Sequence, residues 1–225
     1  MRKLVVGTFV TLDGIMQAPG GPEEDREGGF EHGGWSVHFW DDVMGQIITE
    51  ATLQAGALLL GRKTYEIFAA HWPRVNDEDP VAAKLNSLPK YVASRTLKEV
   101  TWNNSTLIEG GVAEAVARLK NEPGDEIQVH GSGDLIQTLM EHDLVDKYRL
   151  WVFPVVLGAG KRLFARGTLP AAMRLVDTKA SSTGVAIHTY ERAGEIPFGS
   201  FAVDEEHVSQ DLWREQSQSG SSTMG

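Results

Sequence analysis

The 225-residue sequence predicts an α/β protein with a mostly parallel central sheet and helices on both faces. Three observations predict this class. Short apolar runs alternate with amphipathic stretches from residue 3 to residue 145, glycine and polar residues follow several of the runs, and two later runs are joined by a tight turn. The alternation is typical of parallel strands joined by helices, and the last pair is typical of an antiparallel hairpin at one sheet edge.

The first strand and first helix are separated by a long loop. Residues 3–12 are rich in β-branched and apolar side chains and end at Asp13-Gly14, a turn signal, so we expect a buried strand. Residues 14–37 form a glycine-rich loop, which predicts either a cover over an active site or a disordered insert. Over residues 39–55 apolar side chains recur at helical spacing, which predicts an amphipathic helix.

The later elements alternate in the same way. Residues 57–60 form a continuous apolar run between two glycines, which is typical of a strand buried on both faces. Further strands are expected at 91–93, 106–108, 127–130 and 148–157, helices at 62–72, 112–119 and 135–144, and a hairpin at 173–182 and 185–191. Because the composition then shifts toward Ser, Gln and Gly, we expect one domain over 1–192 and an extension over 193–225, in which 204–213 could form a short helix and 216–225 a flexible tail.

The composition limits the classes of function. The chain has 21 Lys and Arg against 31 Asp and Glu, a net charge of −10, and no basic cluster, so we expect neither nucleic acid nor a membrane as partner. Zero cysteines exclude disulfides, thiolate metal sites and a thiol nucleophile. No apolar stretch approaches the roughly 20 residues that span a bilayer, and the N-terminal apolar run is too short for a signal peptide. These features predict a cytoplasmic protein that acts on a small molecule.

Two familiar types of motif are incomplete. Gly131-Ser132-Gly133 follows a strand and precedes a helix, but the third glycine of the dinucleotide-binding fingerprint would fall at Ile136. His32 and His38 of the glycine-rich loop, with scattered carboxylates, are the basis for a metal-dependent hydrolase as a minor alternative. Loop histidines of this kind are usually solvated, so we expect no metal site.

Residues suited to phosphate follow three of the expected strands. They are Gly61, Arg62 and Thr64 after the first, Ser94 and Arg95 after the second, and Gly131, Ser132 and Gly133 after the third. The carboxyl ends of parallel strands meet at one edge of a sheet, where helix N-termini offer free N–H groups to anions. Helix capping and ordinary turns explain each junction taken alone, but the three together favour a nucleotide with several phosphates.

These motifs resemble those of dihydrofolate-reductase-like proteins. Residues 59–66 resemble the G-R-x-T-x-E segment of dihydrofolate reductases, and residues 92–96 are similar to their S-R-T segment. Residues 11–14, 129–133 and 153–160 look more like the reductase domain of the riboflavin-biosynthesis deaminase-reductase, the RibD C-terminal domain, and its stand-alone bacterial relatives. The resemblance covers most of the chain and implies a three-layer α/β/α dihydrofolate-reductase-like fold.

The resemblance also implies an activity and a site. The activity is NADPH-dependent hydride transfer to a C=N or related double bond, with the phosphoribosylamino-uracil of riboflavin biosynthesis as the most concrete substrate, and the family suggests a homodimer. By position, the cofactor would be held by Gly61, Arg62, Thr64, Ser94 and Arg95 at its 2′-phosphate and pyrophosphate side and by Gly131, Ser132 and Gly133 at the pyrophosphate. Asp13 would be catalytic, with Asp13 or water as proton source, and Gly14, Trp40 and Pro154 would contact substrate.

Two departures from the resemblance narrow the substrate. The carboxylate that folate reductases carry on the helix before G-R-x-T would fall near Gly45, and the start of a helix explains Asp41 and Asp42, so we do not expect folate as substrate. The zinc-binding residues of the deaminase half are absent from the sequence. A second class stays open, namely a nucleotide-binding module or sensor without turnover.

Overall fold

The computed structural model describes residues 1–76, 78–165 and 168–201. The chain divides into two units, Met1–Gly194 and Glu195–Gly225, and the elements below belong to the first. The helix expected at 204–213 and the tail expected at 216–225 lie outside the described residues.

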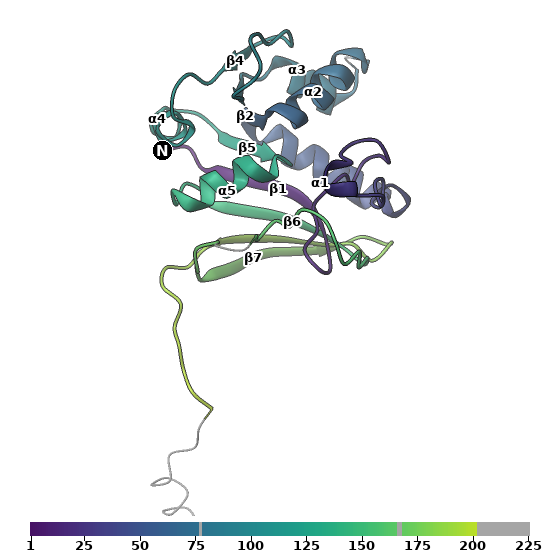
Figure 1. Ribbon diagram of the computed structural model, residues 1–225, viewed down its shortest axis with the longest axis vertical. Helices are drawn as coiled ribbons and strands as arrows, with labels where there is room; N and C mark the ends of the chain where they lie inside the picture. Colours follow the sequence, from purple (N-terminus) through teal and green to yellow (C-terminus); the bar gives the residue numbers. More distant parts are fainter. Residues whose placement is uncertain (77, 166–167, 202–225) are drawn as a thin grey trace, which may run out of the picture. The chain divides into compact units, whose positions relative to one another are not determined.

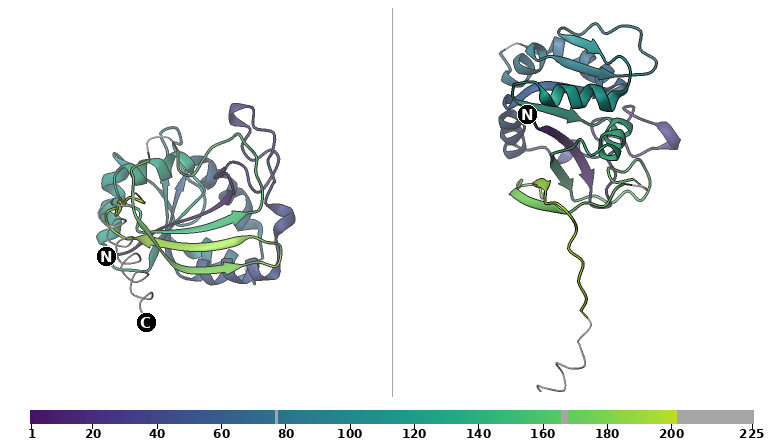
Figure 2. Two further views of the ribbon diagram at one scale, coloured as in Figure 1. Left: turned by 90° about the horizontal axis from the view of Figure 1, so that it is seen from below. Right: turned by 90° about the vertical axis from the view of Figure 1, so that its left-hand side faces the viewer.

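One eight-stranded sheet organises the described part of the first unit, with the strand order β4-β3-β2-β5-β1-β6-β8-β7 (Figure 1). The strands are β1 (Leu4–Thr11), β2 (Ala55–Gly61), β3 (Lys90–Ala93), β4 (Ser105–Leu107), β5 (Glu126–His130), β6 (Lys147–Phe153), β7 (Met173–Ala180) and β8 (Ala186–Arg192). Strands β1 to β6 pair in parallel, whereas β8 runs antiparallel to β6 and to β7. The hairpin lies at one edge (Figure 2), so the predicted sheet is confirmed.

Helices cover both faces of the sheet (Figure 1), as predicted. On one face lie α1 (Asp42–Leu53), α2 (Arg62–His71) and α3 (Pro80–Ser87), and on the other α4 (Val112–Asn121) and α5 (Gly133–Glu141). Short 3-10 helices occupy Glu27–Gly29, Val37–Phe39 and Trp72–Arg74. Helix α3 was not predicted, although Asp79 caps it by accepting from the backbone N–H groups of Val81 and Ala82, a signal that the sequence does contain.

Strand β2 shows why the core has two sides. Leu58, Leu59 and Leu60 are all fully buried. Successive side chains of a strand point to opposite faces, so Leu59 packs with the residues beneath α4 and α5 while Leu58 and Leu60 pack with those beneath α2 and α3. The continuous apolar run is therefore explained by burial on both faces, as expected.

Several predicted boundaries are wrong, among them that of the helix expected at 135–144, which ends at Glu141. Two others have identifiable reasons. The first helix begins at Asp42 and not at Phe39, because Asp41 is its N-cap and accepts from the backbone N–H of Met44 at 2.8 Å. The Asp41 carboxylate also accepts from the backbone and hydroxyl of Ser182 in the hairpin turn, which lowers its pKa. Strand β6 ends at Phe153 rather than at residue 157, because Pro154 has no N–H for the ladder.

The glycine-rich loop over residues 14–37 is packed and not an unstructured insert. Ile15 and Phe30 are buried with part of Trp35 in a small apolar cluster. The buried side-chain amide of Gln17 donates to two loop carbonyls, at 3.1 and 3.0 Å, and the backbone carbonyl of Gln17 accepts from Trp35 Nε1 at 2.8 Å. The loop thus has its own core and hydrogen bonds, which suits a cover over a site.

Candidate functional site

Two of the predicted phosphate turns are joined by a serine hydroxyl. Strands β2 and β5 are parallel neighbours, so the turns after them meet at one edge of the sheet. Ser132 Oγ accepts from the Gly61 N–H at 2.9 Å and lies 2.9 Å from Thr64 Oγ1 and 3.0 Å from the carbonyl oxygen of His130. The structure therefore brings together Gly61, Thr64, Gly131 and Ser132.

The close approach depends on glycine. A Cβ on Gly61 would lie 3.1 Å from Ser132 Cβ, and a Cβ on Gly131 would lie 3.2 Å from Thr64 Oγ1. Gly131 and Ser132 both have left-handed backbones, with φ of 50° and 63°. The N-cap residues Gly61 of α2 and Ser132 of α5 make no side-chain capping hydrogen bond, so among the described residues the first N–H groups of both helices have no cap. Two helix N-termini with open N–H groups thus lie together, which suits a phosphate-bearing ligand.

The predicted cationic and hydroxyl groups flank this pair of turns. Strand β3 neighbours β2, so the turn after β3 lies at the same edge of the sheet. In that turn Ser94 Oγ accepts from the backbone N–H groups of Thr96 and Leu97, at 3.1 and 3.0 Å, and Arg95 is exposed. Arg62 makes a surface ion pair with Glu66 at 3.1 Å, a weak interaction that leaves its guanidinium able to bind another anion.

Asp13 holds a turn of the chain. Its carboxylate accepts from Thr11 Oγ1 at 2.6 Å, from the Leu157 N–H at 3.2 Å and from the Gly158 N–H at 2.8 Å, and Arg162 lies 4.0 Å away. The Thr11 hydroxyl above all, with the two backbone donors, lowers the pKa of Asp13 to about 2. Asp13 is therefore ionised at neutral pH and poorly suited to donate a proton; its catalytic role stays a prediction.

The Asp13 contacts predict a pH-dependent contribution to stability. Because its folded-state pKa lies below the usual 3.8 of an aspartate, the contribution is complete above about pH 4 and is lost as the pH falls through about 2. We expect Asp13→Asn to lower the free energy of unfolding in urea at neutral pH, and the gap to wild type to close toward pH 2. Asp177→Asn, an exposed position on β7, is the control; a gap of constant size for Asp13→Asn would contradict the account.

The three predicted substrate residues are spread out. Gly14 lies in the turn after β1, where its carbonyl accepts from the Leu163 N–H at 3.1 Å. The Trp40 ring is half exposed, with its centroid 6.4 Å from that of Phe9. Pro154 is exposed and lies beside Gly184 in the hairpin turn. These contacts do not join Trp40 or Pro154 to the hydrogen-bonded turns, and their roles stay predictions.

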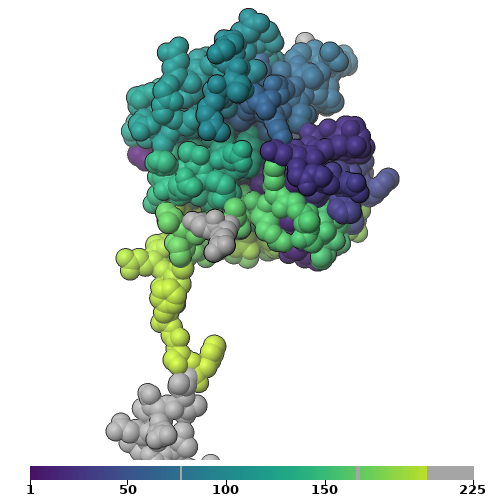
Figure 3. Space-filling view, in the orientation of Figure 1, coloured from purple at the N-terminus to yellow at the C-terminus, as the bar shows by residue number. Residues whose placement is uncertain are grey.

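An ion cluster that sequence reasoning missed ties the loop to α2. Lys63, in the first turn of α2, binds Asp25 and Glu27 at 2.9 and 2.8 Å, and Lys161 binds the same carboxylates at 2.7 and 2.6 Å. The two ammonium groups lower the pKa of Glu27 to about 2. Figure 3 shows the loop, in purple, against the green segment that contains Lys161. No local pattern could reveal four charges so distant in sequence.

Sequence reasoning also missed a small cavity of about 40 Å³ between the sheet and α1. Gly7, Gln128, His130 and Arg149 are among the residues that line it. A signal was present, because polar residues occupy every second position of β5 from Glu126 to His130, which places them on one face of an otherwise apolar strand.

Metal sites and membrane-spanning helices are both absent from the described residues. Within residues 1–76, 78–165 and 168–201, no three His, Asp or Glu side chains gather in an arrangement that could hold a metal ion. In the same ranges, no helix combines the length and the apolarity that crossing a membrane requires.

Comparison with known proteins identifies relatives over nearly the whole chain. The family model described as the RibD C-terminal domain matches residues 2–187. The uncharacterized protein YyaP of Bacillus subtilis (strain 168) is 32% identical over 198 residues, covering 86% of this chain and 96% of YyaP. The uncharacterized protein YwjB of the same organism is 30% identical over 194 residues, covering 85% of this chain and 99% of YwjB.

Solved structures share the fold at low identity. A protein of Shewanella sp. PV-4 named for riboflavin biosynthesis superposes with a TM-score of 0.63 at 22% identity, covering 85% of this chain and 99% of its own. A pyrimidine reductase-like protein of Corynebacterium diphtheriae superposes with a TM-score of 0.57 at 11% identity, covering 86% and 93%. These two likenesses confirm the predicted fold.

Proposed function

The chain belongs to the RibD C-terminal domain family, and from this premise we propose that it is an NADPH-dependent reductase of a small heterocyclic substrate. The observation that carries the proposal is the pair of joined helix N-termini, where Ser132 links the turn after β5 to Gly61 and Thr64. The names of the structural relatives, which refer to riboflavin biosynthesis and pyrimidine reduction, favour a pyrimidine such as the phosphoribosylamino-uracil.

The residues at this edge of the sheet fit the coenzyme. Its pyrophosphate suits the open N–H groups of Gly133 and its neighbours at the start of α5. Its 2′-phosphate suits the guanidinium groups of Arg62 and Arg95, because guanidinium binds phosphate through paired hydrogen bonds. The bound coenzyme would supply the hydride, and the chain would supply orientation and electrostatics.

The reaction also needs a proton source and protection from bulk water. Of the two candidate proton sources we favour water, since the Thr11 hydroxyl and the backbone donors hold the pKa of Asp13 low, and Asp13 keeps the 157–158 turn in place. The loop over residues 14–37, fastened by Lys63 and Lys161, would exclude bulk water from the reacting atoms.

Two further expectations remain proposals, and the first of them, a homodimer, comes from the family. A homodimer could form through the free edge of β7, where Leu175 and Val176 are about half exposed, 48% and 42%. The cytoplasmic location that the sequence features predict is the second proposal. Neither is needed for the cofactor site described above.

The 2′-phosphate assignment predicts a loss of coenzyme preference. Arg62→Ala and Arg95→Ala should each weaken NADPH binding by about 10- to 100-fold, since a charge-assisted hydrogen bond contributes roughly 1.5–3 kcal/mol. NADH, which lacks that phosphate, should bind almost equally to wild type and to both variants. Fluorescence titration of each variant with both coenzymes measures the effect. Arg118→Ala, an exposed arginine on α4, is the control, and an unchanged ratio of NADPH to NADH affinity would refute the assignment.

A further inference from the structure

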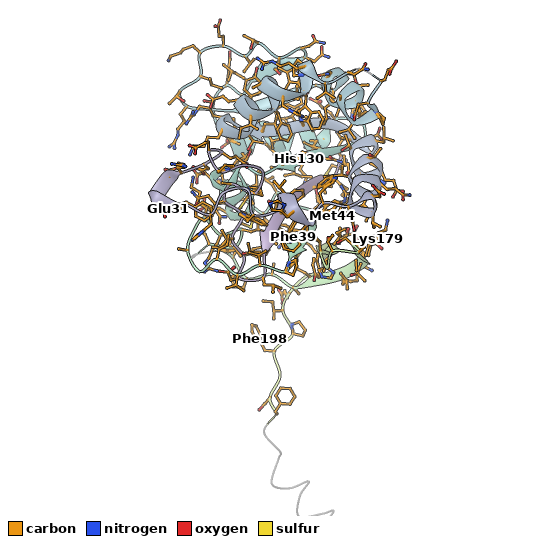
Figure 4. All side chains as sticks on the ribbon, turned by 90° about the vertical axis from the view of Figure 1, so that its right-hand side faces the viewer. Glu31, Phe39, Met44, His130, Lys179 and Phe198 are labelled. Atoms are coloured by element: carbon orange, nitrogen blue, oxygen red, sulfur yellow. The ribbon has the colours of Figure 1, made fainter. Side chains whose placement is uncertain are left out.

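The cavity between the sheet and α1 is lined by an imidazole, that of His130, whose Nδ1 has no hydrogen-bond partner among the described residues. His130 is the last residue of β5 and directly precedes the turn that contains Ser132 (Figure 4 labels His130). It shares the cavity with Gly7 of β1 and Arg149 of β6. The imidazole therefore lies on the face of the sheet that α1 covers, next to the proposed coenzyme-binding turn.

A chain of hydrogen bonds fixes the orientation of the Gln128 side chain. Gln128 Nε2 donates to Glu126 Oε1 at 2.6 Å and to the Ala51 carbonyl oxygen of α1 at 2.7 Å. Because a carbonyl and a carboxylate can only accept, both amide hydrogens of Gln128 are used and the amide cannot be flipped. Gln128 Oε1 therefore faces His130, whose Nε2 lies 3.1 Å away.

This orientation determines the tautomer of His130. Gln128 Oε1 can only accept, so His130 Nε2 must carry a hydrogen. Burial, with the positive charge of Arg149, lowers the pKa of His130 to about 4, so the ring is neutral at neutral pH and carries no second hydrogen. Nδ1 is then an acceptor with a bare lone pair.

The lone pair of Nδ1 faces an open space left by a glycine. Gly7 is the register partner of His130 across β1 and β5, and a Cβ on Gly7 would lie 3.9 Å from Nδ1. In the described part of the chain no residue donates to Nδ1. If Nδ1 were fully buried it would be a second buried polar atom without a partner, but in the described residues Ser105 Oγ is the only such side-chain atom. Nδ1 therefore keeps some accessible surface, and this surface faces the cavity that His130 lines.

We propose that His130 is a substrate-binding residue whose Nδ1 accepts a hydrogen bond from an N–H or O–H group on the edge of the substrate. Gln128 and Glu126 are positioning residues that hold the acceptor tautomer. The volume of about 40 Å³ admits an amino group or a ring edge and not a whole ring. The site selects substrates that present a donor, because an acceptor there would meet the lone pair and leave two polar groups unpaired. Only the identification of this ligand as the reducible substrate rests on the proposed function.

The tautomer can be tested without any ligand. Long-range proton–nitrogen NMR correlation on the nitrogen-15-labelled chain at neutral pH should show a neutral His130 with its hydrogen on Nε2. A hydrogen on Nδ1, or a doubly protonated ring, would overturn the inference.

Binding can be tested with diaminouracil, a uracil with two adjacent amino groups, added with and without NADPH. At saturation the Nδ1 resonance should shift while Nε2 stays hydrogen-bonded to Gln128. Gly7→Ala should raise the dissociation constant for diaminouracil about tenfold, because its methyl group takes up part of the space beside Nδ1. A methyl at Gly7 makes only ordinary contacts, so the fold should be kept. Gly199→Ala, at a position that does not line the cavity and where a Cβ would meet nothing within 4 Å, is the control and should bind the probe like wild type.

The outcomes separate the two proposals. Absence of probe binding, an unmoved Nδ1 resonance at saturation, or equal affinity in Gly7→Ala would each overturn the role of His130. Failure of NADPH to bind, with a normal Nδ1 response to the probe, would refute the proposed reductase and leave the His130 inference standing.

Discussion

Gly133→Asp is expected to raise the dissociation constant for NADPH about 100-fold or more while leaving the chain folded. Gly133 is the first residue of α5, where a Cβ would meet only Met16 Sδ at 3.7 Å, an ordinary contact. A carboxylate at a helix N-terminus stabilises the helix by roughly 0.3–1 kcal/mol, so the melting temperature should not fall. The same carboxylate would occupy the open N–H groups and repel the pyrophosphate, and about 2.7 kcal/mol of repulsion gives the 100-fold loss.

Gly133→Ala is the matched control for this substitution, because it adds the methyl group without the charge. Its affinity for NADPH, measured by calorimetric titration at fixed salt, should stay within about fivefold of wild type. Equal affinities for Gly133→Asp and wild type would mean that phosphate does not bind at the start of α5.

Lys90→Met is expected to lower the free energy of unfolding by about 3 kcal/mol. Lys90 is fully buried at the start of β3, and its ammonium group donates to the carbonyl oxygens of Asn86, Leu88 and Asn103 at 3.0, 2.8 and 2.9 Å. It also lies 4.2 Å from the centroid of the Trp102 ring. Methionine keeps most of the apolar volume but leaves three buried acceptors unpaired, at roughly 1 kcal/mol each.

Chemical denaturation of Lys90→Met measures this effect. Lys98→Met is the control: Lys98 is exposed, so its substitution should change the free energy of unfolding by less than about 0.5 kcal/mol. Strand β3 ends at Ala93, directly before Ser94 and Arg95. Loosening of this strand should therefore lower the affinity for NADPH more than the affinity for NADH, because Arg95 is proposed to bind the 2′-phosphate. A loss of stability below about 1 kcal/mol for Lys90→Met would contradict the structural role given to Lys90.

The order of elements could be predicted because each of them carries a local pattern. The run at Leu58–Leu60 needs burial on both faces, and the alternation of strands with helices leaves few topologies once right-handed crossovers are assumed. The meeting of the turns after β2, β3 and β5 at one edge of the sheet was predictable for the same reason, since parallel strands place their carboxyl ends together. Helix α3 was missed because its apolar residues are few and its clearest signal is a single Asp79 cap.

The rest of the site depends on contacts between distant segments. The cluster of Lys63, Lys161, Asp25 and Glu27 joins three parts of the chain that no periodicity relates. The hydrogen bond from Gly61 to Ser132 likewise spans two turns, and only the sheet order makes it visible. For Asp13 the sequence suggested chemistry, whereas the structure shows a carboxylate already engaged by a hydroxyl and two backbone donors.

Fluorescence titration of the purified chain with NADPH and, separately, with NADH at one salt concentration tests whether the chain binds the coenzyme. We expect saturable binding of both coenzymes with NADPH bound more tightly, because the sheet edge holds open helix N-termini and the guanidinium groups of Arg62 and Arg95. Binding without oxidation by any candidate substrate would favour a sensor that uses the same site. Binding of neither coenzyme would contradict the claim, leaving the fold intact and the three turns in need of a different phosphate ligand.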